Sequence, residues 1–334
     1  MLSKPLGRII AGLVVVVTVM VVWFILQAYP LFHGKGKEVV VSVSNGESLS
    51  QIASELHLKG VIASPLAFRI DTTVFGSPQV QPGSYQIAQG STFSHVRSVF
   101  SASPNVVVID VNAGLTLHEV AVDIANGEGN TYGDKFTQVA TANSTPSSFH
   151  ASGSLEGLIG TGQYIITPGE TPTQLATRME RRFVKQAASV GLTPSTTLNG
   201  LDAYQLVIAA SIVEKEGYYP VNMPQVARVI YNRLARGGPL QMDSTVLYYL
   251  GKDGGTVTPA MLQSQEPYNT YLNTGLTPTP ICAVSTIAMH ATLHPPAGSW
   301  LYFTLINKDG RMAFSTTFAQ QLREERIAQE AGIG

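Results

Sequence analysis

The chain has 334 residues, 44% of them hydrophobic, and a formal net charge of −1, which is enough length for two folded units with a sizeable core. Only 13% of its residues are charged, and such a near-neutral chain lacks the basic footprint of a nucleic-acid-binding protein, so we expect no nucleic acid partner. The single cysteine, Cys282, excludes an intramolecular disulfide and a zinc site built from several cysteines.

The first predicted element is a membrane-spanning helix. Ile9 to Leu26 reads IIAGLVVVVTVMVVWFIL, an uncharged run about as long as a helix needs to cross the hydrocarbon core of a bilayer. A cleaved signal peptide is the alternative, but the run is longer than usual for one, and QAYPLFHG offers no convincing cleavage site. We predict a transmembrane helix at 9–28 and a linker at 29–38, with an orientation that the flanking lysines do not decide.

Two similar β-turn-α patterns follow the linker. From Val39, VVVSVSNGESLSQIASEL predicts a strand, a turn and a helix capped by Ser48. From Val106, VVVIDVNAGLTLHEVAVDI repeats this pattern with Thr116 as the cap. A second pair of similar segments, GSYQIAQGSTFSHV and GQYIITPGETPTQL, recurs at a spacing like that of the first, about 70 to 80 residues. We interpret the two sets as an internal duplication.

Longer helices are predicted in the C-terminal part, after a segment at 126–154 whose Gly, Ser, Thr and Asn content indicates a loop. Asp202 caps a helix that runs through Glu216, Pro224 opens a second, and Ser244 starts a short one. After a further helix capped by Ser285, SWLYFTLINKDGRMAFS predicts a hairpin. The predicted fold class is α+β.

Two carboxylates at the end of an apolar helix are the first candidates for chemistry. LVIAASIVEKEG places Glu214 and Glu216 two positions apart, and because a helix turns by about 100° per residue they point about 200° apart and cannot act on one bond together. Glu216 continues the densest apolar face, where lost hydration raises the pKa of a carboxyl toward the range of a general acid. The alternative is a solvated last turn in which Glu216 pairs with Arg228 or Arg233.

Polar and aromatic side chains follow in two further segments, YNRLARGGPLQMDSTVLYYLG and PYNTYLNTGLTPTP. Amides can bond the hydroxyl and N-acetyl groups of sugars, and tyrosine rings can cover their apolar faces. The candidate substrate-binding residues are Glu214, Asn232, Gln241, Asp243, Thr245, Tyr268, Asn269 and Tyr271. Asp243 is equally suited to capping the helix after it.

Three runs in this order, IAASIVEKEG, ARVIYNRLARGGPLQMDSTVLYYLG and PYNTYLNTGLTPTPI, strongly resemble the endolytic murein transglycosylases, single-pass membrane enzymes of bacterial cell-wall assembly. LEGLIGTGQY and LYFTLINKDGRMAFS are similar to two flanking motifs of that family. The resemblance implies a LysM-like module at 39–103 and a catalytic domain at 104–334 outside the cytoplasmic membrane, with residues 1–8 in the cytoplasm. It also implies peptidoglycan synthases as partners.

The activity implied by the resemblance is cleavage of the β-1,4 bond between N-acetylmuramic acid and N-acetylglucosamine in nascent glycan strands, leaving a 1,6-anhydro end. In that family the second glutamate of the E-K-E motif is catalytic, which corresponds to Glu216. One carboxyl acts first as general acid and then as general base toward the 6-hydroxyl of muramic acid. Glycoside hydrolases generally need two carboxyls instead. No metal or cofactor is implied.

Other functions compete with this interpretation. His290 and His294 are four residues apart, but no third metal ligand is evident. Ser211 and Lys215 have the same spacing, like a Ser-Lys dyad, without a Gly-rich nucleophile turn. The main alternative is a membrane-tethered glycan-binding or scaffold protein whose catalytic domain has decayed, because 159–164 lacks the acid and the proline that the family has there.

Overall fold

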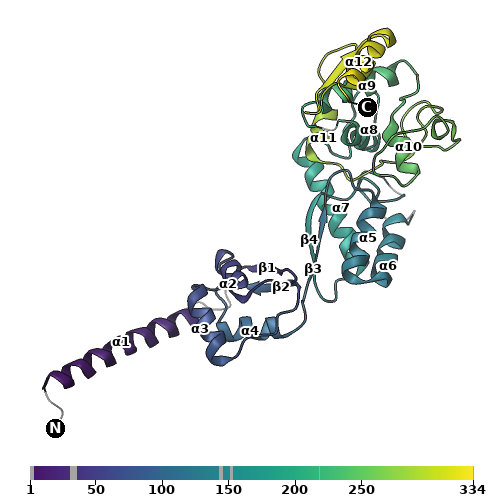
Figure 1. Cartoon of the computed structure of the whole chain (residues 1–334). Helices are drawn as coiled ribbons and strands as arrows, with labels where there is room; N and C mark the ends of the chain where they lie inside the picture. Colours follow the sequence, from purple (N-terminus) through teal and green to yellow (C-terminus); the bar gives the residue numbers. More distant parts are fainter. Residues whose placement is uncertain (1–3, 31–35, 143–145, 151–152, 218, 334) are drawn as a thin grey trace. The chain divides into compact units, whose positions relative to one another are not determined.

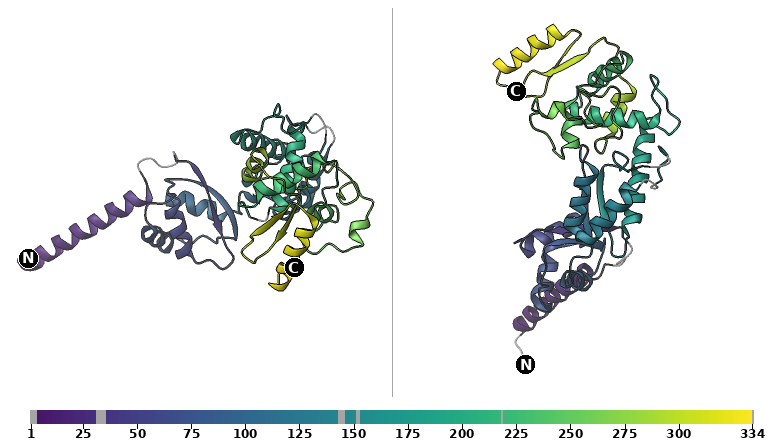
Figure 2. Two further views of the ribbon diagram at one scale, coloured as in Figure 1. Left: turned by 90° about the horizontal axis from the view of Figure 1, so that it is seen from above. Right: turned by 90° about the vertical axis from the view of Figure 1, so that its right-hand side faces the viewer.

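The computed structural model (Figures 1 and 2) describes residues 4–30, 36–142, 146–150, 153–217 and 219–333. The chain forms two compact units, which we call unit 1 (Met1–Val108 with Ile165–Gly169) and unit 2 (Ile109–Tyr164 with Glu170–Gly334). Helices dominate both, and the described strands form three two-stranded sheets. The predicted α+β class is therefore confirmed.

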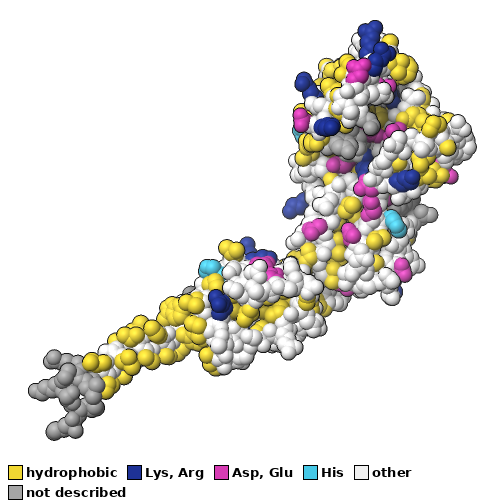
Figure 3. Space-filling view, in the orientation of Figure 1, with side chains coloured by type: hydrophobic (Ala, Val, Ile, Leu, Met, Phe, Trp, Pro, Cys, Tyr) yellow, Lys and Arg dark blue, Asp and Glu magenta, His cyan; other side chains and the backbone are white. Residues whose placement is uncertain are grey.

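Helix α1 (Lys4–Ala28) begins unit 1 and contains the predicted anchor. Its segment Ile9–Ala28 has a mean hydropathy of 3.1 and is long and apolar enough to cross a bilayer. Hydrophobic side chains cover this helix in the space-filling view (Figure 3). At its end Ala28 is buried, and the ring of Phe24 packs edge-on against Phe93. An exposed apolar helix joined to a folded core is consistent with a single-pass anchor.

The rest of unit 1 has the element order β-α-α-β-α. The elements are β1 (Glu38–Val43), α2 (Leu49–Leu58), α3 (Pro65–Phe75), β2 (Gly83–Ala88) and α4 (Phe93–Ser101). β1 pairs antiparallel with β2, so that Val41 lies opposite Tyr85. Ser48 caps α2 through a capping box with Gln51, as the sequence predicted. Apolar faces from both strands and the four helices, α1 included, share one core. The assignment of 39–103 to a LysM-like module stays a prediction.

The same element order recurs in the next part of the chain. The elements are β3 (Val107–Val111), α5 (Leu117–Glu128), α6 (Asn130–Thr141), β4 (Gly162–Ile166) and α7 (Pro172–Ser189). β3 and β4 form a sheet of their own, and the Thr116 capping box of α5 corresponds to that of Ser48. These elements lie where the duplicated patterns predict them.

The prediction of a loop at 126–154 is wrong for its first half, which contains α6. This helix buries Phe136 and Ala140, and it packs closely against α5 because a Cβ at Gly133 would lie 2.5 Å from the Cβ of Ala125. Tertiary packing thus overrides the weak helix propensity of a Gly-, Asn- and Thr-rich segment.

The C-terminal part of unit 2 is built around one buried helix. Its elements are α8 (Ala203–Glu216), α9 (Met223–Ala235), α10 (Asp243–Tyr249), the 3-10 helix η1 (Met261–Gln263), α11 (Thr286–Leu293), β5 (Tyr302–Leu305), β6 (Met312–Ser315) and α12 (Phe318–Glu330). α8 contacts α9, α10 and α11, and every residue from Leu206 to Val213 is buried. The predicted hairpin is present as the antiparallel pair β5–β6.

Candidate active site

Glu216 is the last residue of α8. The helix starts at a capping box between Asp202 and Gln205, and its buried body fixes the direction in which the last turn points. Gly217 follows, and a Cβ there would lie 2.5 Å from Cγ of Met223. Glycine therefore allows the chain to leave α8 close against the start of α9 without displacing Glu216.

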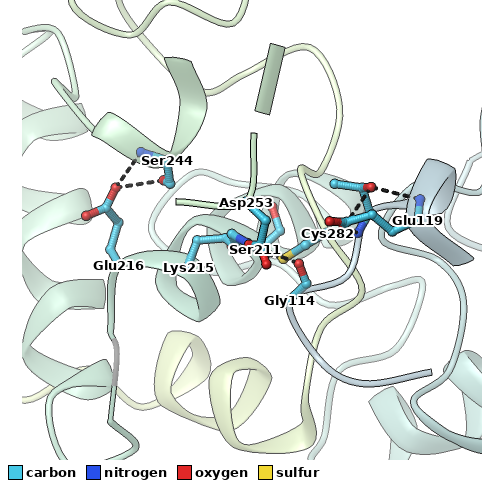
Figure 4. A network of polar contacts seen from close by, with 9 residues as sticks. Gly114, Glu119, Ser211, Lys215, Glu216, Ser244, Asp253 and Cys282 are labelled. Atoms are coloured by element: carbon cyan, nitrogen blue, oxygen red, sulfur yellow. Dashed lines mark hydrogen bonds and ion pairs between the residues drawn. The ribbon is translucent and has the colours of Figure 1, made fainter. Parts of the chain in front are cut away.

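The carboxyl of Glu216 is partly buried and is held by one residue of α10. Its Oε1 accepts a hydrogen bond from the backbone N–H of Ser244 at 3.1 Å and another from the Ser244 hydroxyl at 2.7 Å (Figure 4). Burial raises the pKa of Glu216, the nearby charge of Asp243 raises it further, and the bonds from Ser244 and the charge of Arg233 lower it in part. The net upward shift is the property that a general acid requires.

Two arginines near the site bond to backbone carbonyls. Arg228 donates to two proline carbonyls after α11, and Arg233 donates to the carbonyls of Leu301 and Leu240. Among the ion pairs of the described residues, none includes Glu216. The structural ion pair that competed with a catalytic role is therefore not formed in this structure.

Glu214 is held in the same manner on another side of α8. Its Oε2 accepts from the backbone N–H of Ser285 at 2.9 Å and from the Ser285 hydroxyl at 2.5 Å. Ser285 is the N-cap of α11, so Glu214 ties the end of α8 to the start of that helix. The two glutamates have separate partners on separate helices, in line with the divergence expected from helical geometry.

A cleft of about 740 Å³ in unit 2 lies over the end of α8. Its wall includes the turn Ala113–Leu115, all three residues of the E-K-E motif, the start of α10 and residues 253–255. The β5–β6 hairpin adds the apolar side chains of Phe303, Leu305 and Met312. The cleft thus combines a carboxyl of raised pKa with apolar surface on which a sugar ring can rest.

The family of the chain follows from the span of one match. A model of the YceG-like family matches residues 41–327. The chain belongs to the YceG-like family. It is 29% identical over 313 residues to the endolytic murein transglycosylase of Bacillus subtilis (strain 168), covering 88% of this chain and 85% of that protein.

Two further comparisons agree with this assignment. The endolytic murein transglycosylase of Streptococcus pneumoniae serotype 2 is 23% identical over 332 residues, which cover 90% of this chain and 60% of that longer protein. The crystal structure of a yceG-like protein from Listeria monocytogenes superposes with a TM-score of 0.57 at 25% identity, covering 86% of this chain and 99% of that one. The resemblance drawn from the sequence, to lytic transglycosylases, is confirmed.

Several of the predicted substrate-binding residues of this YceG-like protein lie at cavities. Glu214 and Asp243 line the cleft of Glu216, and Asp243 Oδ1 accepts from the hydroxyl of Tyr271 at 2.6 Å. Tyr268 lines a second cavity of about 510 Å³, also in unit 2. Gln241 is exposed and has a φ of 50°, and its backbone N–H donates to the carbonyl of Thr270. Their contact with substrate stays a proposal.

Three other predicted residues are placed differently. Thr245 and Asn269 are fully buried: the first bonds to Met242 and Thr270, and the second donates to two carbonyls of the η1 segment. Asn232 donates to two carbonyls in the segment that precedes β5. Because these side chains bond to other groups within the protein, we expect them to position the loops around the cleft, and their contact with substrate stays a prediction.

The competing hypotheses of a dyad and a metal site gain no support from the described residues. Ser211 is buried, donates to the carbonyl of Ile208 and accepts from the N–H of Ile281, whereas Lys215 bonds to Asp253 and to the carbonyl of Gly114. His290 lies in α11 and His294 is the C-cap of that helix, and their rings stack with centroids 4.3 Å apart. No group of three or more His, Cys, Asp or Glu that could hold a metal occurs in the described part of the chain.

Glu156 is a site residue that the sequence did not single out, although it is the glutamate of the LEG motif. It is 5% exposed, and its carboxylate accepts from the N–H of Leu117, at the start of α5, and from the hydroxyl of Tyr248 at 3.0 Å. Burial raises its pKa to about 7, although both hydrogen bonds lower it. Glu156 and Tyr248 line the second cavity beside Tyr268.

Stability should depend on pH through Glu156. Because its pKa rises from 4.5 in the unfolded chain to about 7 in the fold, its contribution is fully present below about pH 4.5 and is lost as the pH rises through 7. Glu156→Gln should therefore flatten the fall in the free energy of unfolding between pH 5 and 8, by up to about 3 kcal/mol. The measurement is urea unfolding of the full-length chain in detergent across this pH range. If the free energy of unfolding fell with pH by the same amount in parent and variant, the prediction would be refuted.

Proposed function

We propose that this YceG-like protein is an endolytic lytic transglycosylase that cleaves the β-1,4 bond between N-acetylmuramic acid and N-acetylglucosamine in nascent glycan strands. The observation that carries the proposal is the carboxyl of Glu216, whose pKa is raised by burial in a cleft whose wall includes the apolar side chains of the β5–β6 hairpin. The names of the relatives support lytic transglycosylase activity in general. The proposal goes further than these names in two respects: it assigns catalysis to Glu216, and it gives the product a 1,6-anhydro end.

The proposed reaction uses one carboxyl twice, first to give a proton and then to receive a different one. Ser244 bonds to Oε1 of Glu216, and within the described residues no hydrogen bond reaches Oε2, which leaves that oxygen to carry the proton. The protonated carboxyl gives this proton to the leaving O4 of N-acetylglucosamine as the bond to C1 of muramic acid breaks. The 6-hydroxyl of the same muramic acid then bonds to C1 and returns its proton to Glu216. No water is consumed.

Two other carboxylates near Glu216 are already engaged. Glu214 accepts two hydrogen bonds from Ser285, and Asp243 accepts one from Tyr271. A hydrolase of the retaining or inverting type needs a second carboxylate free to attack the sugar or to activate water. We propose that neither carboxylate plays this part and that the substrate's own hydroxyl attacks.

The altered segment that motivated a decayed enzyme, 159–164, is not among the residues that line the cleft of Glu216. Ile159 and Tyr164 are fully buried, the Tyr164 hydroxyl donates to the carbonyl of Gly160, and the N–H of Gly160 donates to a carbonyl of α7. A Cβ at Gly160 would lie 2.6 Å from the backbone N of Phe183. The segment is thus adapted to packing on α7, and its lost acid and proline give no reason to expect an inactive cleft.

Product analysis tests the function directly. We expect the full-length chain, purified in detergent and incubated with glycan strands, to release fragments that end in 1,6-anhydro-muramic acid. Mass spectrometry distinguishes these fragments, because each is lighter by one water than the product of hydrolysis. Reducing ends in their place would indicate a hydrolase. Binding without any cleavage would indicate the scaffold protein.

The pH dependence of cleavage tests the part that Ser244 plays. Its hydroxyl bonds to Glu216 and lowers the pKa of that carboxyl, so Ser244→Ala should raise this pKa. Since a general acid loses activity as the pH rises through its pKa, the alkaline limb of kcat/KM should move to higher pH in the variant. An unchanged limb, measured across the same buffers, would show that Glu216 is not the group that titrates.

Localisation and partners follow from the same proposal. The substrate lies outside the cytoplasmic membrane, so α1 would hold residues 1–8 in the cytoplasm and the catalytic domain, 104–334, on the outer side. Two strands enclosing two helices, as in β1-α2-α3-β2, support a LysM-like glycan-binding role for 39–103. Peptidoglycan synthases, which make the nascent strands, are the proposed partners.

A further inference from the structure

Lys215 and Asp253 lie where the two cavities of unit 2 meet. Both residues line the cleft of about 740 Å³ that contains Glu216, and both line the cavity of about 510 Å³ that contains Tyr248 and Tyr268. Lys215 Nζ donates to Asp253 Oδ1 at 2.5 Å and to the carbonyl of Gly114 at 3.2 Å (Figure 4). The ion pair therefore lies at the border that the two cavities share.

The two members of this pair are held very differently. Lys215 belongs to the buried helix α8, and its side chain is 19% exposed, whereas the side chain of Asp253 is 61% exposed. Asp253 lies in a segment with three glycines of positive φ, Gly251, Gly254 and Gly255, and a Cβ on any of them would meet nothing within 4 Å. Such a segment can move at little cost, so the aspartate can leave while the lysine stays.

Lys215 is also nearly alone as a basic residue among many acidic ones. It is the only lysine or arginine among the described residues that line the larger cavity, and Lys252 is the only other in the smaller one. The acidic residues that line the two cavities are Glu119, Glu156, Glu214, Glu216, Asp243, Asp253 and Glu266. A ligand with a carboxylate would be repelled over most of this surface, and Lys215 offers it a fixed positive charge beside Glu216.

We propose that Lys215 binds a carboxylate of the substrate and that Asp253 occupies this position in the free protein. This inference rests on the proposed function and deepens it. Muramic acid carries a lactyl carboxylate when its peptide has been removed, and otherwise its stem peptide supplies carboxylates. Displacement of Asp253 joins the two cavities into one groove, in which the strand continues from Glu216 to the rings of Tyr248 and Tyr268.

The test measures binding in a variant that does not cleave. Full-length Glu216→Gln protein in detergent is titrated calorimetrically with three ligands of equal length: peptide-free glycan strands, peptide-bearing strands, and neutral oligomers of N-acetylglucosamine. We expect one class of acidic strand to bind about tenfold more tightly than the neutral oligomer. Preference for peptide-free strands identifies the lactyl group, and preference for peptide-bearing strands identifies the stem peptide.

Two added substitutions should act in opposite directions. Lys215→Gln should abolish the preference for acidic strands, whereas Asp253→Asn, which removes the competing carboxylate, should strengthen their binding by about threefold and leave the neutral oligomer unaffected. Lys215→Arg should keep the preference, as should the matched control Lys185→Gln, which changes an exposed lysine of α7 that lines neither cavity. High salt should reduce the preference in every variant that has it.

The outcomes distinguish a failure of the proposed role of Lys215 from a failure of the proposed function. If no glycan binds to any variant, the proposed function fails. If strands bind but Lys215→Gln keeps the preference for acidic strands, the proposed function stands and the role of Lys215 is refuted. The same holds if Asp253→Asn weakens the binding of acidic strands. If Lys215→Gln does not fold, as judged by circular dichroism, the sign of the Asp253→Asn effect decides alone.

Discussion

Replacing Glu216 with glutamine is expected to lower the rate of glycan cleavage by about three orders of magnitude and to leave the affinity for strands nearly unchanged. The amide keeps the size of the side chain and can still accept from Ser244, but its N–H groups are far too weakly acidic to protonate the leaving oxygen. The measurement is the initial rate of fragment release by the full-length chain, with affinity taken from calorimetry. Equal rates for variant and parent would remove Glu216 from the mechanism.

Glu214→Gln is the matched control for this experiment. It makes the same chemical change two residues away, at a carboxylate whose two hydrogen bonds come from Ser285. An amide oxygen can still accept these bonds, so the variant should retain part of its activity. A loss as large as that of Glu216→Gln would mean that the end of α8, and not one carboxyl, is what the reaction requires.

The second large effect concerns the stability of unit 2. Gly157 has a φ of +70°, and a Cβ there would lie 2.2 Å from the Cβ of Pro280 and 3.2 Å from the carbonyl oxygen of Cys282. Gly157→Ala combines a left-handed backbone with a collision inside the core, so we expect it to lower the free energy of unfolding by about 2 to 5 kcal/mol. Urea unfolding, followed by the fluorescence of Trp300 in unit 2, measures the loss.

Gly191→Ala separates the two causes of that loss. Gly191 also has a positive φ, +88°, but nothing lies within 4 Å of the position of its Cβ. Its replacement should therefore cost only the backbone part, about 1 to 2 kcal/mol. If the two alanine variants lost the same stability, the contact with Pro280 would contribute nothing.

Local patterns in the sequence were sufficient for the elements that frame the site. The capping residues Ser48, Thr116 and Asp202 start their helices in the structure, and the β5–β6 hairpin is where alternating residues predicted it. Each of these signals lies within a few residues of the element that it specifies. Helix α6 was missed because its stability comes from packing on α5, which no local pattern reports.

For the site itself, the sequence indicates features within one helix but not the contacts that one helix makes with another. Glu216 is a candidate from the sequence because it continues an apolar face of its own helix and matches the second glutamate of the E-K-E motif, and the structure places it at a cleft. Ser244, 28 residues away, was not chosen, since its bond to Glu216 exists only once α10 packs at the end of α8. For the same reason Thr245 and Asn269 were expected at the cleft: residue type indicates that a side chain needs polar partners, but not whether these are sugar or protein.

The two serine contacts at the end of α8 have a consequence for the charge that the reaction produces. Ser244 gives both its amide and its hydroxyl to one oxygen of Glu216, as Ser285 does for Glu214. In the proposed reaction Glu216 loses its proton, and the new anion would already have two donors in place, so that neither solvent nor a rotating side chain would have to rearrange to stabilise it. Ser244 is thus already positioned in the free protein to stabilise the anion that the second half of the proposed reaction needs.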